Sequence, residues 1–283
     1  MSNEISFDAF PPAEMANKAE AVGVKKANLE PLTMFALAML AGAFIGCGAI
    51  FCTTVLAGTS SLPYGVQRLL GGLTFTLGLI LVVVGGSELF TGNNLIIMAF
   101  ADGKVTLTGL LRNWGIVYAG NFVGSVLTAL IMFLSKQYTF GGGAVGITAL
   151  SIGNAKCGLE FVQAIALGIM CNALVCMAVW LCFSARSTTD KIMAIIPPIA
   201  AFVAAGFEHS VANMYFIPVA LFIKGDAAWL AGLADKAPNV ANLTWVNFFL
   251  ANLLPVTIGN IIGGAGMVGL VYWFIFLRTQ PKK

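Results

Sequence analysis

Long apolar runs separated by short polar segments dominate the pattern along the chain. A helix that crosses a bilayer needs about 20 predominantly apolar residues, and each run reaches that length. The segments between the runs contain breakers such as Gly58-Thr-Ser-Ser and Gly141-Gly-Gly, which are typical of loops. The pattern therefore predicts an all-α integral membrane protein with six transmembrane helices, at about residues 33–57, 69–99, 109–134, 159–183, 192–223 and 246–277.

The second and fifth runs are too long and too interrupted to be simple helices. The second contains Gly86-Ser-Glu-Leu-Phe-Thr-Gly-Asn93, and the fifth contains Gly206-Phe-Glu-His-Ser-Val-Ala-Asn213. Backbone that is not helical survives at membrane depth only where protein or a water-filled cavity satisfies its polar groups. We therefore expect both helices to be broken, and broken helices in matching halves point to a transport site. The residues expected to hold the breaks are Gly86, Glu88, Asn93, Gly206 and Asn213.

The breaks belong to a longer internal repeat. Spans three and six share a pattern of Asn and Gly at a shift of 139 positions, and spans one and four share a weaker pattern at a shift of 126. The chain thus divides into two three-span halves, at about 32–136 and 157–279. Because three is odd, the halves insert upside down relative to each other, which predicts an inverted repeat. The matched positions are Asn113, Gly120, Asn121 and Gly124 with Asn252, Gly259, Asn260 and Gly263, and Phe35, Ala38 and Gly42 with Phe161, Ala164 and Gly168.

Composition adds a polar lead to this membrane domain. The chain is 59% hydrophobic and 10% charged, against about 25% charged in a soluble domain. Residues 32–279 are predicted to form one transmembrane domain, and residues 1–31 a cytoplasmic lead. In this lead Pro11-Pro12 could start a short amphipathic helix, with a partly ordered tail as the alternative. The lead is polar and charged, so it is not a signal peptide.

Charge predicts orientation rather than a nucleic-acid partner. The net charge is only +3, and the 15 Lys and Arg residues lie in the tails and loops. Ten of them fall on the side of the two termini and five on the other side. This excess predicts that both termini are cytoplasmic.

No cofactor or metal is expected. The six cysteines lack paired metal-ligand spacing and are interpreted as small buried hydrophobes, and a single histidine serves a metal poorly. Gly264-Ala-Gly-Met-Val-Gly269 fits a dinucleotide-binding pattern, but it lies in an apolar span with no preceding strand.

His209, the only histidine, and Thr91 are the candidates for direct contact with a ligand. Two broken helices that face each other would present amides and positive dipole ends in the middle of the membrane, which favours a small anion. His209 could donate a hydrogen bond to a carboxylate or hand over a proton, because the reference pKa of histidine, about 6.5, lies near working pH. The alternative is a satisfied structural histidine. Its depth in the membrane favours a functional role.

The other residues near the breaks have structural alternatives. Glu88 and Glu208 would line an anion path poorly and are expected to accept loop amides that fix the breaks. Lys156 could draw anions into a vestibule, pair with Glu208, or be a solvated loop lysine. Asn172 lies among apolar residues and needs a partner. Five large apolar side chains could constrict a pore, although each could also be ordinary packing: Phe75, Leu79, Leu89, Phe90 and Phe202.

Four stretches together resemble the formate/nitrite transporter family over nearly the whole chain. Residues 83–92 and 168–178 look like its two signatures, residues 206–213 resemble its second broken helix, and residues 257–264 its last span. The lead, residues 6–15, looks most like that of the bacterial formate channels of this family. The resemblance implies an aquaporin-like fold, and a homopentamer with one pore per protomer in the lipid bilayer of the bacterial inner membrane.

The resemblance also implies roles for residues. His209 and Thr91 would form the central polar pair, and the N-terminal helix would take part in gating at acid pH. The remaining roles are a set of hydrophobic constrictions at Leu79, Leu89, Phe90, Phe75 and Phe202, and an electrostatic network beside His209 at Lys156, Asn172 and Glu208.

The predicted function is a passive, pH-gated channel for formate and related small monovalent anions, with proton coupling through His209 as a hypothesis. Glu88 stands where formate channels often have aspartate, which leaves a nitrite or hydrosulfide channel as the alternative. Ala173 is smaller than the residue expected in the second signature. A water or polyol channel typically carries Asn-Pro-Ala at its breaks, and this chain has none. An intramembrane enzyme using Glu208 and His209 would lack a metal-ligand pair or a nucleophile elbow, and a non-conducting scaffold is a third alternative.

Overall fold

The six predicted spans are present in the computed structural model, which describes residues 8–279 and is helical, without strands, over that range. Ser6 and Phe7 of the lead segment 6–15, and two of the lysines counted in the charge pattern, Lys282 and Lys283, lie outside the described residues. Six helical segments are long and apolar enough to cross a membrane by length and composition. They are α2 (Pro31–Leu56), α3 (Tyr64–Gly85), α6 (Leu107–Leu134), α8 (Phe161–Ser184), α9 (Thr188–Ala205) and the final run Trp245–Phe276.

The final run is a composite helix. It consists of α12 (Trp245–Asn247), the π-helical η4 (Phe248–Leu253), α13 (Leu254–Ile261), the π-helical η5 (Ile262–Leu270) and α14 (Val271–Phe276). The wider π turns lie around Pro255, which cannot donate a backbone hydrogen bond, and around the glycines of 263–269. The hydrophobic pattern predicted one span here, and it contains no information on these local changes of helical pitch.

Both predicted breaks are present. α3 ends at Gly85 and Gly86 takes φ 78°, a left-handed conformation that suits glycine; the chain then runs extended into α4 (Phe90–Asn93), η1 (Asn94–Ile96) and α5 (Ile97–Ala101). In the same way α9 ends at Ala205, Gly206 takes φ 80°, and α10 (Ser210–Lys224) completes the span. Each broken span thus consists of one long and one shorter half.

Close helix contacts fix the register of the two halves. The backbone N–H of Glu88 donates to the carbonyl of Leu37, and that of Glu208 donates to the carbonyl of Leu167. Likewise, a Cβ on Gly124 would lie 1.9 Å from the Met39 oxygen, and one on Gly263 would lie 2.1 Å from the Ile169 oxygen.

These contacts correct the predicted register of spans one and four. The helices α2 and α8 correspond at a shift of 130, not 126, because Leu37 and Met39 correspond to Leu167 and Ile169. A slip of four residues returns a helix to nearly the same face, so small residues match in either register. The shift of 139 between spans three and six is confirmed by the shared role of Gly124 and Gly263.

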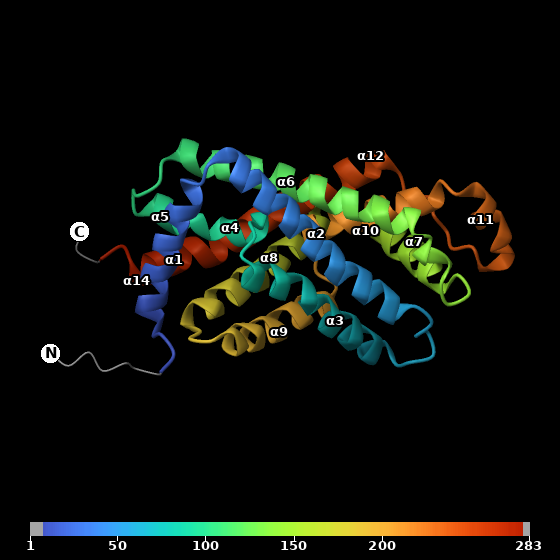
Figure 1. Cartoon of the computed structure of the whole chain (residues 1–283), viewed down its shortest axis with the longest axis horizontal. Helices are drawn as coiled ribbons and strands as arrows, with labels where there is room; N and C mark the ends of the chain where they lie inside the picture. Colours follow the sequence, from blue (N-terminus) through green and yellow to red (C-terminus); the bar gives the residue numbers. More distant parts are fainter. Residues whose placement is uncertain (1–7, 280–283) are drawn as a thin grey trace.

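Two further helices lie at opposite ends of the molecule (Figure 1). α1 (Pro12–Ala27) forms the helix that Pro11-Pro12 was expected to start, and it packs against η1 and α5. α7 (Ala144–Cys157), which the pattern did not predict, packs against α10. The ends of the described chain lie beside α1, and the short α11 (Ala227–Gly232) lies near α7 at the other end. We refer to these ends as the α1 side and the α7 side.

Candidate functional site

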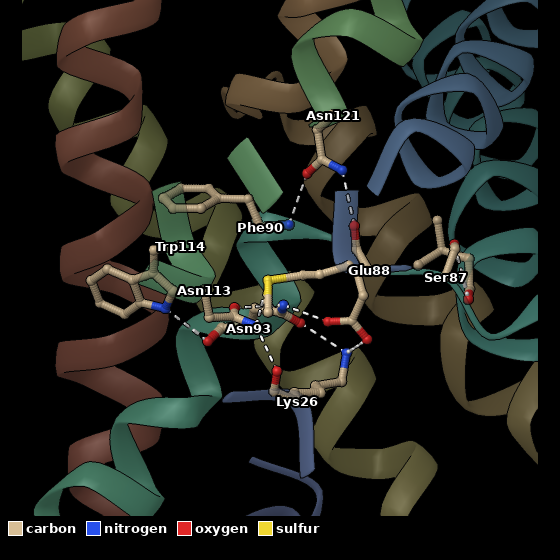
Figure 2. A network of polar contacts seen from close by, with 10 residues as sticks. Lys26, Ser87, Glu88, Phe90, Asn93, Asn113, Trp114 and Asn121 are labelled. Atoms are coloured by element: carbon tan, nitrogen blue, oxygen red, sulfur yellow. Dashed lines mark hydrogen bonds and ion pairs between the residues drawn. The ribbon is translucent and has the colours of Figure 1, made fainter. Parts of the chain in front are cut away.

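A carboxylate holds the first break on the α1 side (Figure 2). Glu88 accepts from the Lys26 ammonium at 2.9 Å and from the Asn93 side-chain amide at 2.7 Å. The same amide donates to Asn113 Oδ1 at 2.9 Å, and the Asn113 amide donates to the backbone oxygen of Lys26. Lys26 also donates to Asn93 Oδ1 at 2.8 Å, so the end of α1 is tied directly into the break.

The second break carries the same network on the α7 side. Glu208 accepts from Lys156 at 2.8 Å and from the Asn213 amide at 2.7 Å. The Asn213 amide also donates to Asn252 Oδ1 at 2.7 Å, and the Asn252 amide donates to the backbone oxygen of Lys156 at 2.9 Å and to Glu208 at 3.2 Å. Glu88 and Glu208 therefore fix the breaks, but not through loop amides as expected: among the described residues, their carboxylates accept from lysine and asparagine side chains.

The network makes α1 the structural counterpart of α7. Lys26 stands in the last turn of α1 and Lys156 in the last turn of α7, again 130 positions apart and with matching partners. The repeated unit therefore extends upstream of the predicted boundaries at 32 and 157, and it includes a helix that the sequence pattern assigned to the lead.

One further asparagine closes each break: Asn121 on α6 closes the first, and Asn260 on α13 closes the second. Asn121 Oδ1 accepts the Phe90 N–H and its amide donates to the Glu88 carbonyl, both at 2.9 Å. Asn260 does the same for Ser210 and Glu208, also at 2.9 Å. The first backbone N–H of each second half-helix is thus already bonded. The sequence had led us to expect this group to be free to bind an anion, and it is not.

Thr91 and His209 meet between the two breaks. Thr91 Oγ1 lies 2.8 Å from His209 Nε2, and the two residues are 0% and 2% exposed. His209 Nδ1 accepts the backbone N–H of Ala212 at 3.2 Å, so the imidazole is also the N-cap of α10. Because Nδ1 is an acceptor, the neutral ring carries its proton on Nε2 and donates toward Thr91. The predicted central pair is therefore in contact.

Asn172 lies away from the network in which the resemblance placed it. Lys156 and Glu208 are paired, but the Asn172 amide donates to the oxygens of Thr91, Asn94 and Asn260, at 3.3, 2.8 and 2.7 Å. Asn172 therefore supports the Thr91 half of the central pair. The equivalent position in the first half is Gly42, and there Ser125 on α6 contacts the carbonyl of Val211 at 3.5 Å.

Two cavities approach the central pair from opposite sides. The α7 vestibule is about 290 Å³ and reaches His209, and the α1 vestibule is about 320 Å³ and ends at Leu79 and Leu89. Phe75 and Phe202 line the α7 vestibule with ring centroids 5.8 Å apart, and the Phe202 ring lies 5.9 Å from that of His209.

The fifth predicted constriction residue points elsewhere. The ring of Phe90 lies 4.9 Å from that of Tyr118 and 6.1 Å from that of Trp114, both on α6, and it lines neither vestibule. Figure 2 shows the Phe90 ring turned toward Trp114 and away from Glu88. Four of the five apolar residues therefore face the cavities.

Sequence reasoning missed several residues of the site. The sequence did contain a signal for Lys26, because it precedes the first break as Lys156 precedes the second. The correspondence of the two lysines becomes visible only once the shift of 130 between α2 and α8 is known. The asparagines of spans three and six were noticed as a repeat, without a role. The missed residues are Lys26, Asn113, Asn121, Ser125, Asn252 and Asn260. No group of three His, Cys, Asp or Glu side chains that could hold a metal occurs within residues 8–279.

The fold and the site define an integral membrane protein of two inverted halves with paired broken helices, which is a layout of transport proteins. The chain belongs to the formate/nitrite transporter family, whose model matches residues 13–274. It is 46% identical over 283 residues to the formate channel FocA of Escherichia coli strain K12, covering 99% of both chains, and 39% identical over 271 residues to the formate channel FocA of Haemophilus influenzae, covering 95% of both.

A solved structure agrees with this assignment. A pentameric formate channel with formate bound matches with a TM-score of 0.82 at 49% identity, covering 88% of this chain and 98% of that one. The expected family and the all-α membrane fold are confirmed. Membership of a transporter family also argues against the intramembrane enzyme and the water or polyol channel.

Proposed function

We propose that the protein is a homopentameric formate channel of the bacterial inner membrane, with one pore per protomer. The formate channels among its relatives and the pentameric, formate-bound structure support the cargo and the assembly. The excess of Lys and Arg on the side of the termini supports cytoplasmic termini, so the α1 side faces the cytoplasm and the α7 side the periplasm. Residues 32–279 form the channel domain, to which α1 contributes a wall.

The Thr91–His209 contact between two cavities carries this proposal. On its way to the central pair an anion loses water between apolar side chains, Phe75 and Phe202 inside the α7 vestibule and Leu79 and Leu89 at the end of the α1 vestibule. Between these side chains the Nε2–H of His209 and the hydroxyl of Thr91 are the polar hydrogens within reach of a carboxylate, and a charge-assisted hydrogen bond there offsets part of the lost hydration.

His209 acts in this proposal as a neutral donor. A protonated imidazole carries hydrogens on both nitrogens, so Nδ1–H would face the N–H of Ala212 and the cap of α10 would be lost. Loss of an N-cap costs about 1 kcal/mol, in addition to burying the charge. Proton coupling through His209 therefore requires the cap to open, and passage of the anion does not.

Three variants in proteoliposomes test the proposal. His209→Asn keeps an oxygen near the Nδ1 position and so keeps the cap, His209→Gln places an amide near Nε2, and Thr91→Val removes only the hydroxyl. We expect wild-type protein to conduct formate, with His209→Gln retaining more formate flux than His209→Asn. Thr91→Val should lower the preference for formate over nitrite and hydrosulfide.

The pH profile separates donation from proton transfer. If the neutral-donor role is correct, flux through wild type and through His209→Gln follows the same pH dependence between about pH 5 and 8. Loss of the pH dependence in both His209 variants, with retention in Thr91→Val, would show proton transfer instead. Vesicles that carry folded wild-type pentamer and conduct no formate would refute the channel itself.

A further inference from the structure

The two vestibules have the same charge balance, built from different residues. The charged residues lining the α7 vestibule are Arg68, Lys156 and Glu208. Those lining the α1 vestibule are Lys191, Lys26 and Glu88. In each cavity one lysine is paired with the glutamate of its break, at 2.8 and 2.9 Å. Each cavity therefore keeps one cation that no carboxylate neutralises.

These remaining cations are Arg68 and Lys191. Arg68 is the fifth residue of α3 and Lys191 the fourth of α9, the corresponding long halves of the two broken spans. Neither side chain forms an ion pair with an acidic residue within the described range of 8–279. Both are partly exposed, as a residue that meets an incoming anion must be.

Arg68 has a second property that suits this position. Its Nε donates to the carbonyl of Ala204 at 2.9 Å and one Nη donates to the carbonyl of Val203, so it caps the carboxyl end of α9. That end carries roughly half a negative charge and points at the vestibule, where it would repel an anion. A guanidinium has five N–H donors, so capping leaves others for the cavity.

We infer that Arg68 and Lys191, rather than the glutamate-paired Lys156 and Lys26, draw anions into the two vestibules, one on each face of the membrane. The inference rests on the proposed channel function and adds the residues that set its rate of anion capture. A paired lysine adds little to the field at a distance, because its glutamate cancels it, whereas an unpaired cation raises the local concentration of anions in a cleft with low-dielectric walls.

The test is sided flux at low and high salt. Arg68→Gln and Lys191→Gln are compared with wild type in vesicles sorted by protease access to α1, with formate well below saturation. At about 10 mM salt, removal of one charge roughly 10 Å from the anion is expected to lower flux by about two- to twentyfold, for an effective dielectric between water and a protein surface. Arg68→Gln should act on flux from the α7 side, and Lys191→Gln on flux from the α1 side.

Control variants separate charge from structure. Arg68→Lys keeps the charge but not the two-pronged cap, and it should retain most of the wild-type flux at low salt. Lys236→Gln on the α7 side and Lys25→Gln on the α1 side remove exposed charges that line neither vestibule and should change little. At about 1 M salt, and at saturating formate, the differences should disappear.

Two results would overturn the inference. Equal flux from wild type, Arg68→Gln and Lys191→Gln at low salt would show that these cations do not recruit anions. Equal loss in Arg68→Lys and Arg68→Gln would show that Arg68 acts as a helix cap. In either case wild-type flux remains, whereas absence of formate flux in wild type would refute the proposed channel instead.

Discussion

The two breaks share a framework and differ in the side chains that they present between the two vestibules. Glu88 and Glu208, with their paired asparagines, build the same clasp on each side. At the tip, however, Leu89 and Thr91 of the first break stand where the second has His209 and Val211. The repeat provides two positioned half-helices, and the positions at which they differ provide the hydrogen-bonding pair. Chemistry in this protein lies in the departure from symmetry.

The clasps also differ in how the carboxylate is bonded. Glu208 accepts from three side chains, Lys156, Asn213 and Asn252, whereas Glu88 accepts from two, Lys26 and Asn93. Lys156 is 16% exposed and Lys26 27%. On the α1 side the carboxylate therefore has fewer donors and its lysine is more exposed, and that lysine also donates to Asn93 Oδ1.

The largest effect should come from removing one carboxylate charge. Glu208→Gln leaves Lys156 without its counter-ion and turns an N–H toward a donor, so we expect a loss of about 3–5 kcal/mol in the free energy of unfolding. Glu88→Gln should cost less, about 1–3 kcal/mol, because Lys26 keeps Asn93 Oδ1 and reaches water. Unfolding of the purified protein in detergent measures both, and equal losses would contradict the difference between the clasps.

A smaller loss in the free energy of unfolding should follow when the residues that support the central pair in the second half are replaced by those of the first half. The first half has Gly42 and Ser125 where the second has Asn172 and Gly264. A Cβ on Gly264 would lie 2.2 Å from the Asn172 amide, so Gly264→Ser should lose about 1–3 kcal/mol through overpacking.

Adding Asn172→Gly should recover part of that loss, because it removes the side chain that the new Cβ meets. Recovery will be incomplete, since Cys176 Sγ lies 2.8 Å from the same Cβ position. A double-mutant cycle of unfolding free energies checks this coupling. Strictly additive losses would mean that the two halves do not use alternative supports.

The smallest effect concerns how α1 is held. Glu20 on α1 is bonded to Lys104 at 2.7 Å, and burial raises the pKa of Glu20 above its usual 4.5. Docked α1 therefore binds this proton more tightly than released α1, so this residue favours docking as pH falls toward the raised pKa and disfavours it as pH rises.

Hydrogen exchange of α1, corrected for the intrinsic rate, should show protection that holds or increases between about pH 7 and 5, with a flatter profile in Glu20→Gln. Acid release of α1 that is abolished in Glu20→Gln would contradict this sign. If wild type releases α1 in acid and Glu20→Gln does so equally, the trigger lies elsewhere, with the Lys26–Glu88 pair as the next residue pair to test.

The sequence by itself determined the spans, the two breaks and the two candidate residues between them, Thr91 and His209. Span length follows from the bilayer, so hydrophobic runs alone locate the six segments. Gly86 and Gly206 mark the breaks because left-handed backbone favours glycine, and Glu88 with Glu208 repeats the polar clasp in each half. His209 could be singled out because an ionisable residue at membrane depth needs a function or a partner.

Tertiary structure alone decided the partners. The shift of 126 was as acceptable to a helical pattern as the true 130, because four residues are close to one turn, and only backbone contacts separate them. Asn172 could not be assigned to Thr91, nor Arg68 to the end of α9, since hydrogen bonds across 81 and about 136 residues leave no local pattern. The match of α1 with α7 was also hidden from the sequence. Both are short helices with weak hydrophobic patterns, and such helices owe their stability to the surface on which they dock.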